Sequence, residues 1–220
     1  MILNKRSSWS YFAPGVFQRK VMTPKQCDNL LDYCISNANG WIGPENAEDI
    51  HGCPRVLSGY PDYFSPEDVE WAIRNYKRFR EFPTENMAPQ LQLAMLRFAE
   101  ELMPSVAAIH GIDLRRPLDP FVACYEAREG HNAFLSPHVD KQRAAVVVQL
   151  NSPRDYQGGG TRYTNLGVTA PEKVGMGVTH TGAKAYEADP EEAEELYPHL
   201  VHEALEVTEG ARYTLCLFYL

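Results

Sequence analysis

Two stretches decide the fold of this chain: His138-Val139-Asp140, and the later run HEALEVTEGARYT from His202 to Thr214. In an extended strand, side chains two residues apart point to the same face, so His138 and Asp140 can bind one ion together. His202, arriving from another strand, would complete a set of two imidazoles and one carboxylate that holds a metal on one face and leaves other coordination positions open. Arg212 adds a permanent cation that can hold a carboxylate through two hydrogen bonds.

The residues between these stretches form further motifs in the same order. Ala144 to Asn151 is a β-branched apolar run that ends in Leu-Asn, and Gly158 to Tyr163 is a glycine turn followed by Thr-Arg-Tyr. With the two stretches above, over roughly residues 121–220, the sequence resembles the prolyl 4-hydroxylase-like branch of the 2-oxoglutarate/Fe(II) dioxygenase superfamily. Position 212 is an arginine, whereas animal prolyl 4-hydroxylases often have lysine at the corresponding position. In this respect the sequence resembles the bacterial and lysyl-hydroxylase-like members of the family.

The resemblance implies a ligand set and a cosubstrate site. His138, Asp140 and His202 would hold Fe(II), and Arg212 would bind the distal carboxylate of 2-oxoglutarate, helped by Thr214 and Tyr125. The second cosubstrate would be O2, with succinate and CO2 as products. Without the resemblance, a structural salt bridge explains Arg212 as well as cosubstrate binding does, and packing in the core explains Tyr125 equally well.

Three histidines compete for the distal ligand position. His180 lies in a strand-like run and resembles a family position where histidine does not bind metal, and His199 follows Pro198 in an apparent turn. Only His202 is followed by a glycine-containing turn and an arginine. We therefore predict His202 as the ligand.

Length and composition narrow the class of protein. At 220 residues the chain can bury a core as one domain, and 29 acidic against 21 basic residues give a net charge of −8. That balance argues against nucleic-acid or anionic-membrane partners. The five cysteines form no Cys-x-x-Cys pair, which favours buried free thiols. No signal peptide or membrane-length apolar run is evident, so we expect a cytoplasmic protein.

The pattern along the chain predicts an α+β fold. We expect one domain over 1–220, with a helical N-terminal half at about 1–118 and a β core at about 119–220. Helices are predicted from Thr23 to Gly40, from Ser65 to about Arg80, and from Ala88 to Met103. These would pack on one sheet of a double-stranded β-helix, a jelly-roll or cupin-like barrel. The long segment 41–64 contains three candidate lid residues, Trp41, His51 and Tyr60.

The sequence predicts an enzyme, an Fe(II)- and 2-oxoglutarate-dependent hydroxylase, because Asp140 is present where halogenases of the superfamily have a small residue. We expect an amino-acid-like small molecule or natural-product precursor as substrate. The alternatives are a peptidyl-prolyl or other protein side-chain hydroxylase and, from another class, a non-catalytic metal-binding β-barrel. Possible substrate contacts near the metal are Arg128, His131, Lys141, Gln142 and Arg143.

Overall fold

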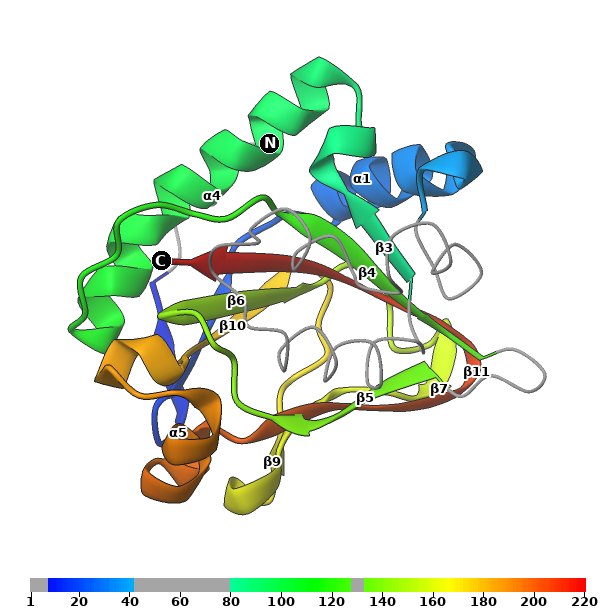
Figure 1. Ribbon diagram of the computed structural model, residues 1–220. Helices are drawn as coiled ribbons and strands as arrows, with labels where there is room; N and C mark the ends of the chain where they lie inside the picture. The colour runs from blue at the N-terminus through cyan, green and yellow to red at the C-terminus, as the bar shows by residue number, and fades with distance from the viewer. Residues whose placement is uncertain (1–7, 42–79, 128–132) are drawn as a thin grey trace.

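The computed structural model describes residues 8–41, 80–127 and 133–220. Strands form two facing layers, and two long helices cover the outer face of the larger layer (Figure 1). The larger sheet has the strand order β1-β2-β10-β6-β11-β4-β3, and the smaller sheet is built on the first half of β11 by β5, β7 and β8, with β9 beside β8. This is the double-stranded β-helix predicted from the sequence.

The strands of the larger sheet come from both halves of the chain. They are β1 (Ser10–Ala13), β2 (Val16–Lys20), β3 (Arg80–Pro83), β4 (Phe121–Glu126), β6 (Ala144–Gln149), β10 (Met176–Thr181) and the second half of β11 (His202–Tyr219). The smaller sheet adds β5 (Ala133–His138), β7 (Tyr156–Gly158), β8 (Thr161–Tyr163) and β9 (Val168–Thr169).

Strand β11 belongs to both sheets and brings the two predicted motif halves into one chamber. Its first half pairs with β5, β7 and β8, and from Ala211 onward it pairs with β4 and β6. Gly210 lies between the two halves with φ of 69°, and a side chain there would meet the carbonyl oxygen of Asp155 at 2.3 Å. His202 therefore lies in the smaller sheet and Arg212 in the larger one.

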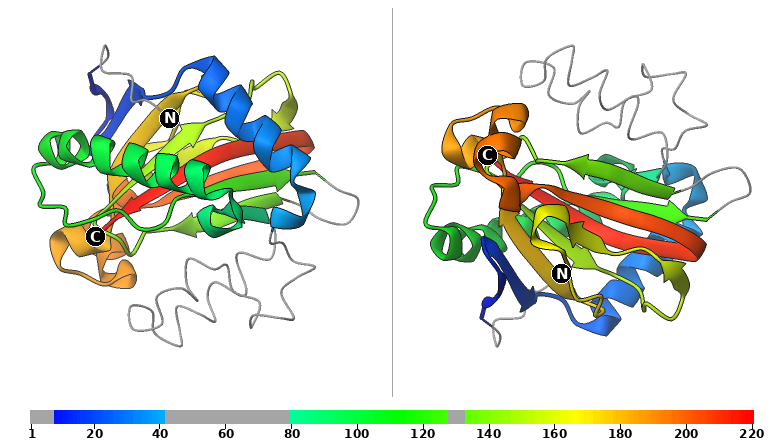
Figure 2. Two further views of the ribbon diagram at one scale, coloured as in Figure 1. Left: turned by 90° about the horizontal axis from the view of Figure 1, so that it is seen from above. Right: turned by 90° about the horizontal axis from the view of Figure 1, so that it is seen from below.

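Helices α1 (Pro24–Ser36) and α4 (Pro89–His110) lie along the outer face of the larger sheet (Figure 2). The predicted capping box at the start of α1 is confirmed, because Thr23 and Gln26 each hydrogen-bond the other's backbone N–H. Leu215, Leu217 and Tyr219 of β11 share one apolar cluster with the buried faces of both helices. Their alternation with Arg212, Thr214 and Cys216 places those three side chains on the inner face of the sheet, as predicted.

The structure differs from the predicted element boundaries in four places. Helix α1 ends at Ser36 rather than at Gly40, and a separate 3-10 turn covers Ala38–Gly40. The N-terminal half contributes strands β1, β2 and β3 as well as helices, and α4 continues to His110 rather than ending near Met103. The sequence also predicts a loop from Glu126 to Ser136, before Pro137, but part of it is strand β5. Within the described chain β5 pairs only with β11, and an edge strand tolerates proline.

Several predictions fall outside the described residues: the helix from Ser65, which apart from Arg80 lies there entirely, the lid candidates His51 and Tyr60, and Cys53. The other four cysteines are buried and free, as predicted. Within the part of the chain that the structure describes, no helix has the length and apolarity needed to cross a membrane.

The other helical segments of the described chain include α5 (Pro190–Leu196), which Asp189 caps, and the 3-10 turns Ala183–Tyr186 and Pro198–Leu200. They pack around Val139 and Val201, next to the predicted metal ligands.

Candidate metal centre and cosubstrate site

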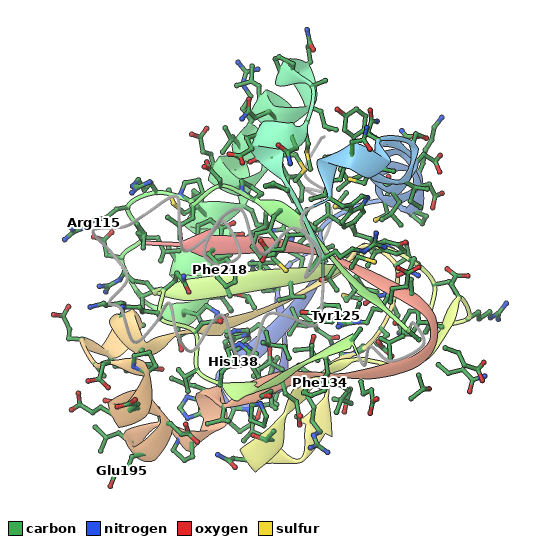
Figure 3. The ribbon with its side chains drawn as sticks, turned by 45° about the vertical axis from the view of Figure 1, so that its right-hand side comes forward. Arg115, Tyr125, Phe134, His138, Glu195 and Phe218 are labelled. Carbon is green, nitrogen blue, oxygen red and sulfur yellow. The ribbon has the colours of Figure 1, made fainter. Side chains whose placement is uncertain are left out.

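His138, Asp140 and His202 converge at one end of the chamber between the sheets. His138 ends β5, His202 begins β11, and the two are direct cross-strand partners. One ligand atom from each of the three residues lies within 4.8 Å of the others, and all three residues are buried. His138 is labelled in Figure 3, where its side chain points into the space between the two layers.

Backbone contacts orient both imidazoles toward Asp140. Nδ1 of His138 hydrogen-bonds the carbonyl oxygen of Ser136 at 2.8 Å, and Nδ1 of His202 hydrogen-bonds that of Leu200 at 2.8 Å. A carbonyl can only accept, so each Nδ1 carries the proton and each Nε2 presents a lone pair. Those Nε2 atoms lie 3.5 and 3.6 Å from the Asp140 carboxylate oxygens. Metal-binding histidines in proteins are held in the same way.

These distances fit a transition metal of ordinary bond length. Two ligand atoms each about 2.1 Å from a metal are about 3 Å apart at a right angle and about 4 Å apart when opposite. The separations of 3.5 and 3.6 Å lie within that range. Two neutral imidazoles and a carboxylate with open positions form the ligand set that proteins use for non-haem Fe(II). The residues therefore fit the metal that the sequence predicts.

The protonation states also suit a metal. Burial on its own would raise the pKa of Asp140, but the surrounding imidazoles outweigh it and hold the pKa well below its usual range. Burial lowers the pKa of His202 well below its usual value, and the neighbouring His180 and His138 act in the same direction. An ionised carboxylate beside a neutral imidazole is the form in which both bind a metal.

His180, which the sequence excluded as a ligand, lies directly behind the metal centre. Its Nε2 is 2.9 Å from Oδ2 of Asp140, and its Nδ1 is 2.8 Å from the Tyr163 hydroxyl. His180 is 1% exposed and Tyr163 is fully buried. The hydroxyl donates to Nδ1, so Nε2 carries the proton and donates to Asp140. This chain of two hydrogen bonds was not predicted, although Tyr163 belongs to the glycine-turn motif.

Arg212 lies on the inner face of the larger sheet and is 3% exposed. Its Nε donates to Oε1 of Gln149 at 3.1 Å and its Nη2 donates to the Thr161 hydroxyl at 3.1 Å. Glu172 lies 3.4 Å from Nε, so the structural salt bridge considered from the sequence does form. The hydrogen bonds to Gln149 and Thr161 use Nε and Nη2 of the guanidinium.

Tyr125 and Thr214, the other two predicted cosubstrate residues, lie beside Arg212. Tyr125 is its direct partner on β4, and the guanidinium carbon lies 5.8 Å from the ring centre. Burial is the main cause that raises the pKa of Tyr125. The positive charge of Arg212 lowers this pKa, and the negative charge of Asp140 raises it. Thr214 is 1% exposed, and its hydroxyl lies 3.7 Å from the Cys216 sulfur. Tyr125, between the sheets in Figure 3, thus lies near both the metal centre and the cosubstrate anchor.

The glycine turn makes room for this anchor. Gly159 has φ of 72°, and a side chain there would lie 3.1 Å from Cδ of Arg212 and 2.9 Å from the Tyr156 ring. The Tyr156 hydroxyl accepts from Gln149 at 3.1 Å and donates to Glu172 at 2.6 Å. Asn151, from the Leu-Asn motif, hydrogen-bonds backbone groups of Ala211 and Tyr213, on either side of Arg212. The sequence predicted the motifs but not these partners of the arginine.

The remaining candidates are placed as follows. Gln142 is buried, and Arg143 lies 3.7 Å from Glu187. His199 lies in the 3-10 turn Pro198–Leu200. Its ring packs against Gly15, which belongs to the turn between β1 and β2. Arg128 and His131 are outside the described residues. A role of Lys141, Gln142 or Arg143 in substrate binding stays a prediction.

Comparisons with known proteins agree with this fold. Two solved structures of a viral collagen prolyl hydroxylase from Paramecium bursaria Chlorella virus-1 are similar to the chain. One, in complex with 2-oxoglutarate, has 16% identity, coverage of 90% of each chain and a TM-score of 0.57. The other has 14% identity, coverage of 96% of this chain and 94% of that one, and a TM-score of 0.56. No protein-family profile matches the chain.

A multifunctional procollagen lysine hydroxylase and glycosyltransferase from Caenorhabditis elegans is 31% identical over 100 residues. The match covers 44% of this chain and 12% of that much longer protein. The chain therefore has the fold of the prolyl 4-hydroxylase-like 2-oxoglutarate/Fe(II) oxygenases, and the resemblance stated from the sequence is confirmed at this level.

Proposed function

We propose that the protein is an Fe(II)- and 2-oxoglutarate-dependent dioxygenase that hydroxylates a peptidyl side chain, prolyl or lysyl. The observation that carries the proposal is the convergence of His138, Asp140 and His202, with both Nδ1 atoms bound to backbone carbonyls. When bound, Fe(II) with 2-oxoglutarate and O2 supplies oxidative decarboxylation and hydroxylation of an unactivated C–H bond.

The protein's own residues position the reactants and exclude water. Arg212 and Thr214 would bind the distal carboxylate of 2-oxoglutarate, while Gln149, Thr161 and Glu172 hold the guanidinium in place. Except for the half-buried Glu172, these groups are buried, so their interactions with the cosubstrate are stronger than they would be in water. His138, Asp140 and His202 would hold the metal with three protein groups, and the ligand set would leave coordination positions for the cosubstrates.

The peptidyl substrate replaces the small molecule expected from the sequence. The relatives described above give that expectation no support. Their names are those of a collagen prolyl hydroxylase and a procollagen lysine hydroxylase. The 31% match to the latter is the stronger of the two in sequence, and it favours a peptidyl substrate.

The test is succinate formation under Fe(II) and 2-oxoglutarate, with mass spectrometry of short proline- and lysine-containing peptides. We expect succinate together with a peptide mass increase of one oxygen. The Arg212→Ala variant is the matched control, because it keeps all three metal ligands. A wild-type protein that binds Fe(II) but whose metal spectrum never responds to 2-oxoglutarate would instead be a metal-binding barrel without catalysis.

A further inference from the structure

Glu81, on strand β3, is a buried carboxylate that neither the metal centre nor the cosubstrate anchor uses. It is 3% exposed, and its Oε1 atom has no hydrogen-bond partner among the described residues. Burial raises its pKa to about 8, and no neighbouring charge offsets that effect. A carboxylate buried without a partner is costly, so its presence calls for a reason other than packing.

Strand pairing places Glu81 on the inner face of the larger sheet. Glu81 is the direct partner of Ala123, Ala123 is the partner of Thr214, and Thr214 is the partner of Gln149. Directly paired residues present their side chains on the same face, so these four form one row across the sheet. Thr214 and Gln149 belong to the cosubstrate site described above. Glu81 therefore faces the same chamber.

The row has one small residue, Ala123, between Glu81 and Thr214. Adjacent strands are about 4.8 Å apart, so the backbone of Glu81 lies about 10 Å from that of Thr214. Phe121, Leu135 and Cys216 belong, with Ala123, to the apolar cluster between the sheets. The chamber next to Glu81 is thus lined by apolar side chains.

Electrostatics connect Glu81 to the metal end of the chamber. Burial is the main cause that raises the pKa of Cys216 to about 12, and the negative charges of Glu81 and Asp140 act in the same direction. Both carboxylates therefore lie within electrostatic reach of one thiol.

The neighbouring arginine does not neutralise Glu81. Arg80 projects to the opposite face of β3, where it bonds Glu126 at 2.6 Å and lies over the Trp41 ring. Arg80 pairs with Glu126, so it does not serve as a cation for Glu81. With its pKa raised to about 8, Glu81 is protonated at neutral pH in the folded chain, and a cation bound beside it would lower that pKa and ionise it.

We propose that Glu81 binds a cationic group of the substrate, the ammonium of a lysyl-type side chain, inside the chamber that holds the metal. The inference rests on the proposed function and names its substrate class. An ammonium group supplies the hydrogen-bond donors and the charge that Glu81 lacks, and the four-carbon stem of a lysyl side chain suits the apolar lining. A prolyl side chain offers neither.

The first experiment compares substrates and needs no variant. Capped peptides that differ only at one position, lysine, norleucine, acetyl-lysine or proline, are titrated into the wild-type protein loaded with Zn(II) and 2-oxoglutarate. Binding is followed by calorimetry. We expect the lysine peptide to bind roughly ten- to hundredfold more tightly than the norleucine and acetyl-lysine peptides, as for a buried hydrogen bond between charged groups. Free L-lysine in the same titration separates a free amino acid from a peptidyl source of the ammonium.

The second experiment changes the carboxylate. Glu81→Gln is expected to abolish the preference for lysine over norleucine while leaving 2-oxoglutarate binding unchanged. Glu206→Gln is the matched control, because Glu206 is an exposed carboxylate on β11, and it should keep the preference. If Glu81→Gln does not fold, the wild-type comparison of peptides still decides.

The outcomes separate the two proposals. Equal wild-type binding of lysine and norleucine peptides, or an unchanged preference in folded Glu81→Gln, overturns the role of Glu81 even if succinate is formed. Absence of any 2-oxoglutarate response in the wild type overturns the proposed function itself.

Discussion

Replacing His180 with alanine tests how the metal centre is held. The change removes the Nε2–H that donates to Oδ2 of Asp140 at 2.9 Å, between residues that are 1% and 8% exposed. A buried hydrogen bond to an ionised acceptor contributes about 1.5–3 kcal/mol. At about 1.4 kcal/mol per factor of ten, that is roughly a 10- to 150-fold loss of Fe(II) affinity if the whole contribution serves to orient the carboxylate. Substitutions of residues that support metal ligands commonly cost about 10- to 100-fold.

The assay is anaerobic titration with Fe(II), and with Co(II) so that its visible spectrum reports the coordination geometry. We expect His180→Ala to bind both metals at least tenfold more weakly and to change the Co(II) spectrum. His180→Gln, which can place an amide N–H near Asp140, should recover part of the affinity. Tyr163→Phe removes only the neutral hydrogen bond to Nδ1 and should cost less, about two- to tenfold.

His199→Ala serves as the control, because His199 lies against Gly15 rather than against the ligands. The reasoning is refuted if folded His180→Ala, with a wild-type circular dichroism spectrum, binds Co(II) with unchanged affinity and an unchanged visible spectrum. In that case the 2.9 Å contact would not orient Asp140.

Three other substitutions test separate parts of the site. Arg212→Ala should abolish detectable 2-oxoglutarate binding in calorimetry but keep Fe(II) affinity within about threefold, and Arg212→Lys should bind 2-oxoglutarate with intermediate affinity, because it keeps the charge and loses the two-pronged geometry. Asp140→Ala should lose most turnover, while the wild type should give hydroxylated product even in chloride-rich buffer; a chlorinated product in mass spectra would contradict this. Glu81→Gln should change the pH dependence of stability: the pKa of Glu81 is raised to about 8 in the folded state, so the wild type loses stability as the pH rises from about 4.5 to 8, and the variant does not. In thermal melts the variant should be more stable than the wild type by a small amount at pH 4 and by a larger amount at pH 8. An equal difference at both pH values would contradict the assignment of the raised pKa to Glu81.

The parts of the site that follow from local pattern were accessible from the sequence. The alternation along β11 places Arg212 and Thr214 on one face and Leu215 and Leu217 on the other, and the structure has the same arrangement. His138 and Asp140 also come together as predicted, although β5 ends at His138 and Asp140 lies beyond the strand. Only the alternation along β11 therefore follows directly from the period of an extended strand, which the sequence displays.

The residues that support the ligands were not accessible in this way. His180 contacts Asp140, and Glu172 contacts Arg212, from strands and turns that are distant in sequence. Which strands become neighbours depends on pairing, and in this chain β11 crosses from one sheet to the other. The sequence could therefore name the candidate ligands and the candidate cosubstrate anchor but not the groups that fix their orientation.

Glu81 shows the same limit most clearly. No motif in the sequence singles out Glu81, which stands in the run Arg80-Glu81-Phe82-Pro83. In the structure Arg80 and Glu81 point to opposite faces of β3, as adjacent residues of a strand do: Arg80 bonds Glu126 on one face, and Glu81 is buried on the other. The partner of Glu81 on β4 is Ala123, whose side chain is a single methyl group. Both the face that Glu81 occupies and the size of this neighbour follow from strand pairing, which no motif in the sequence displays.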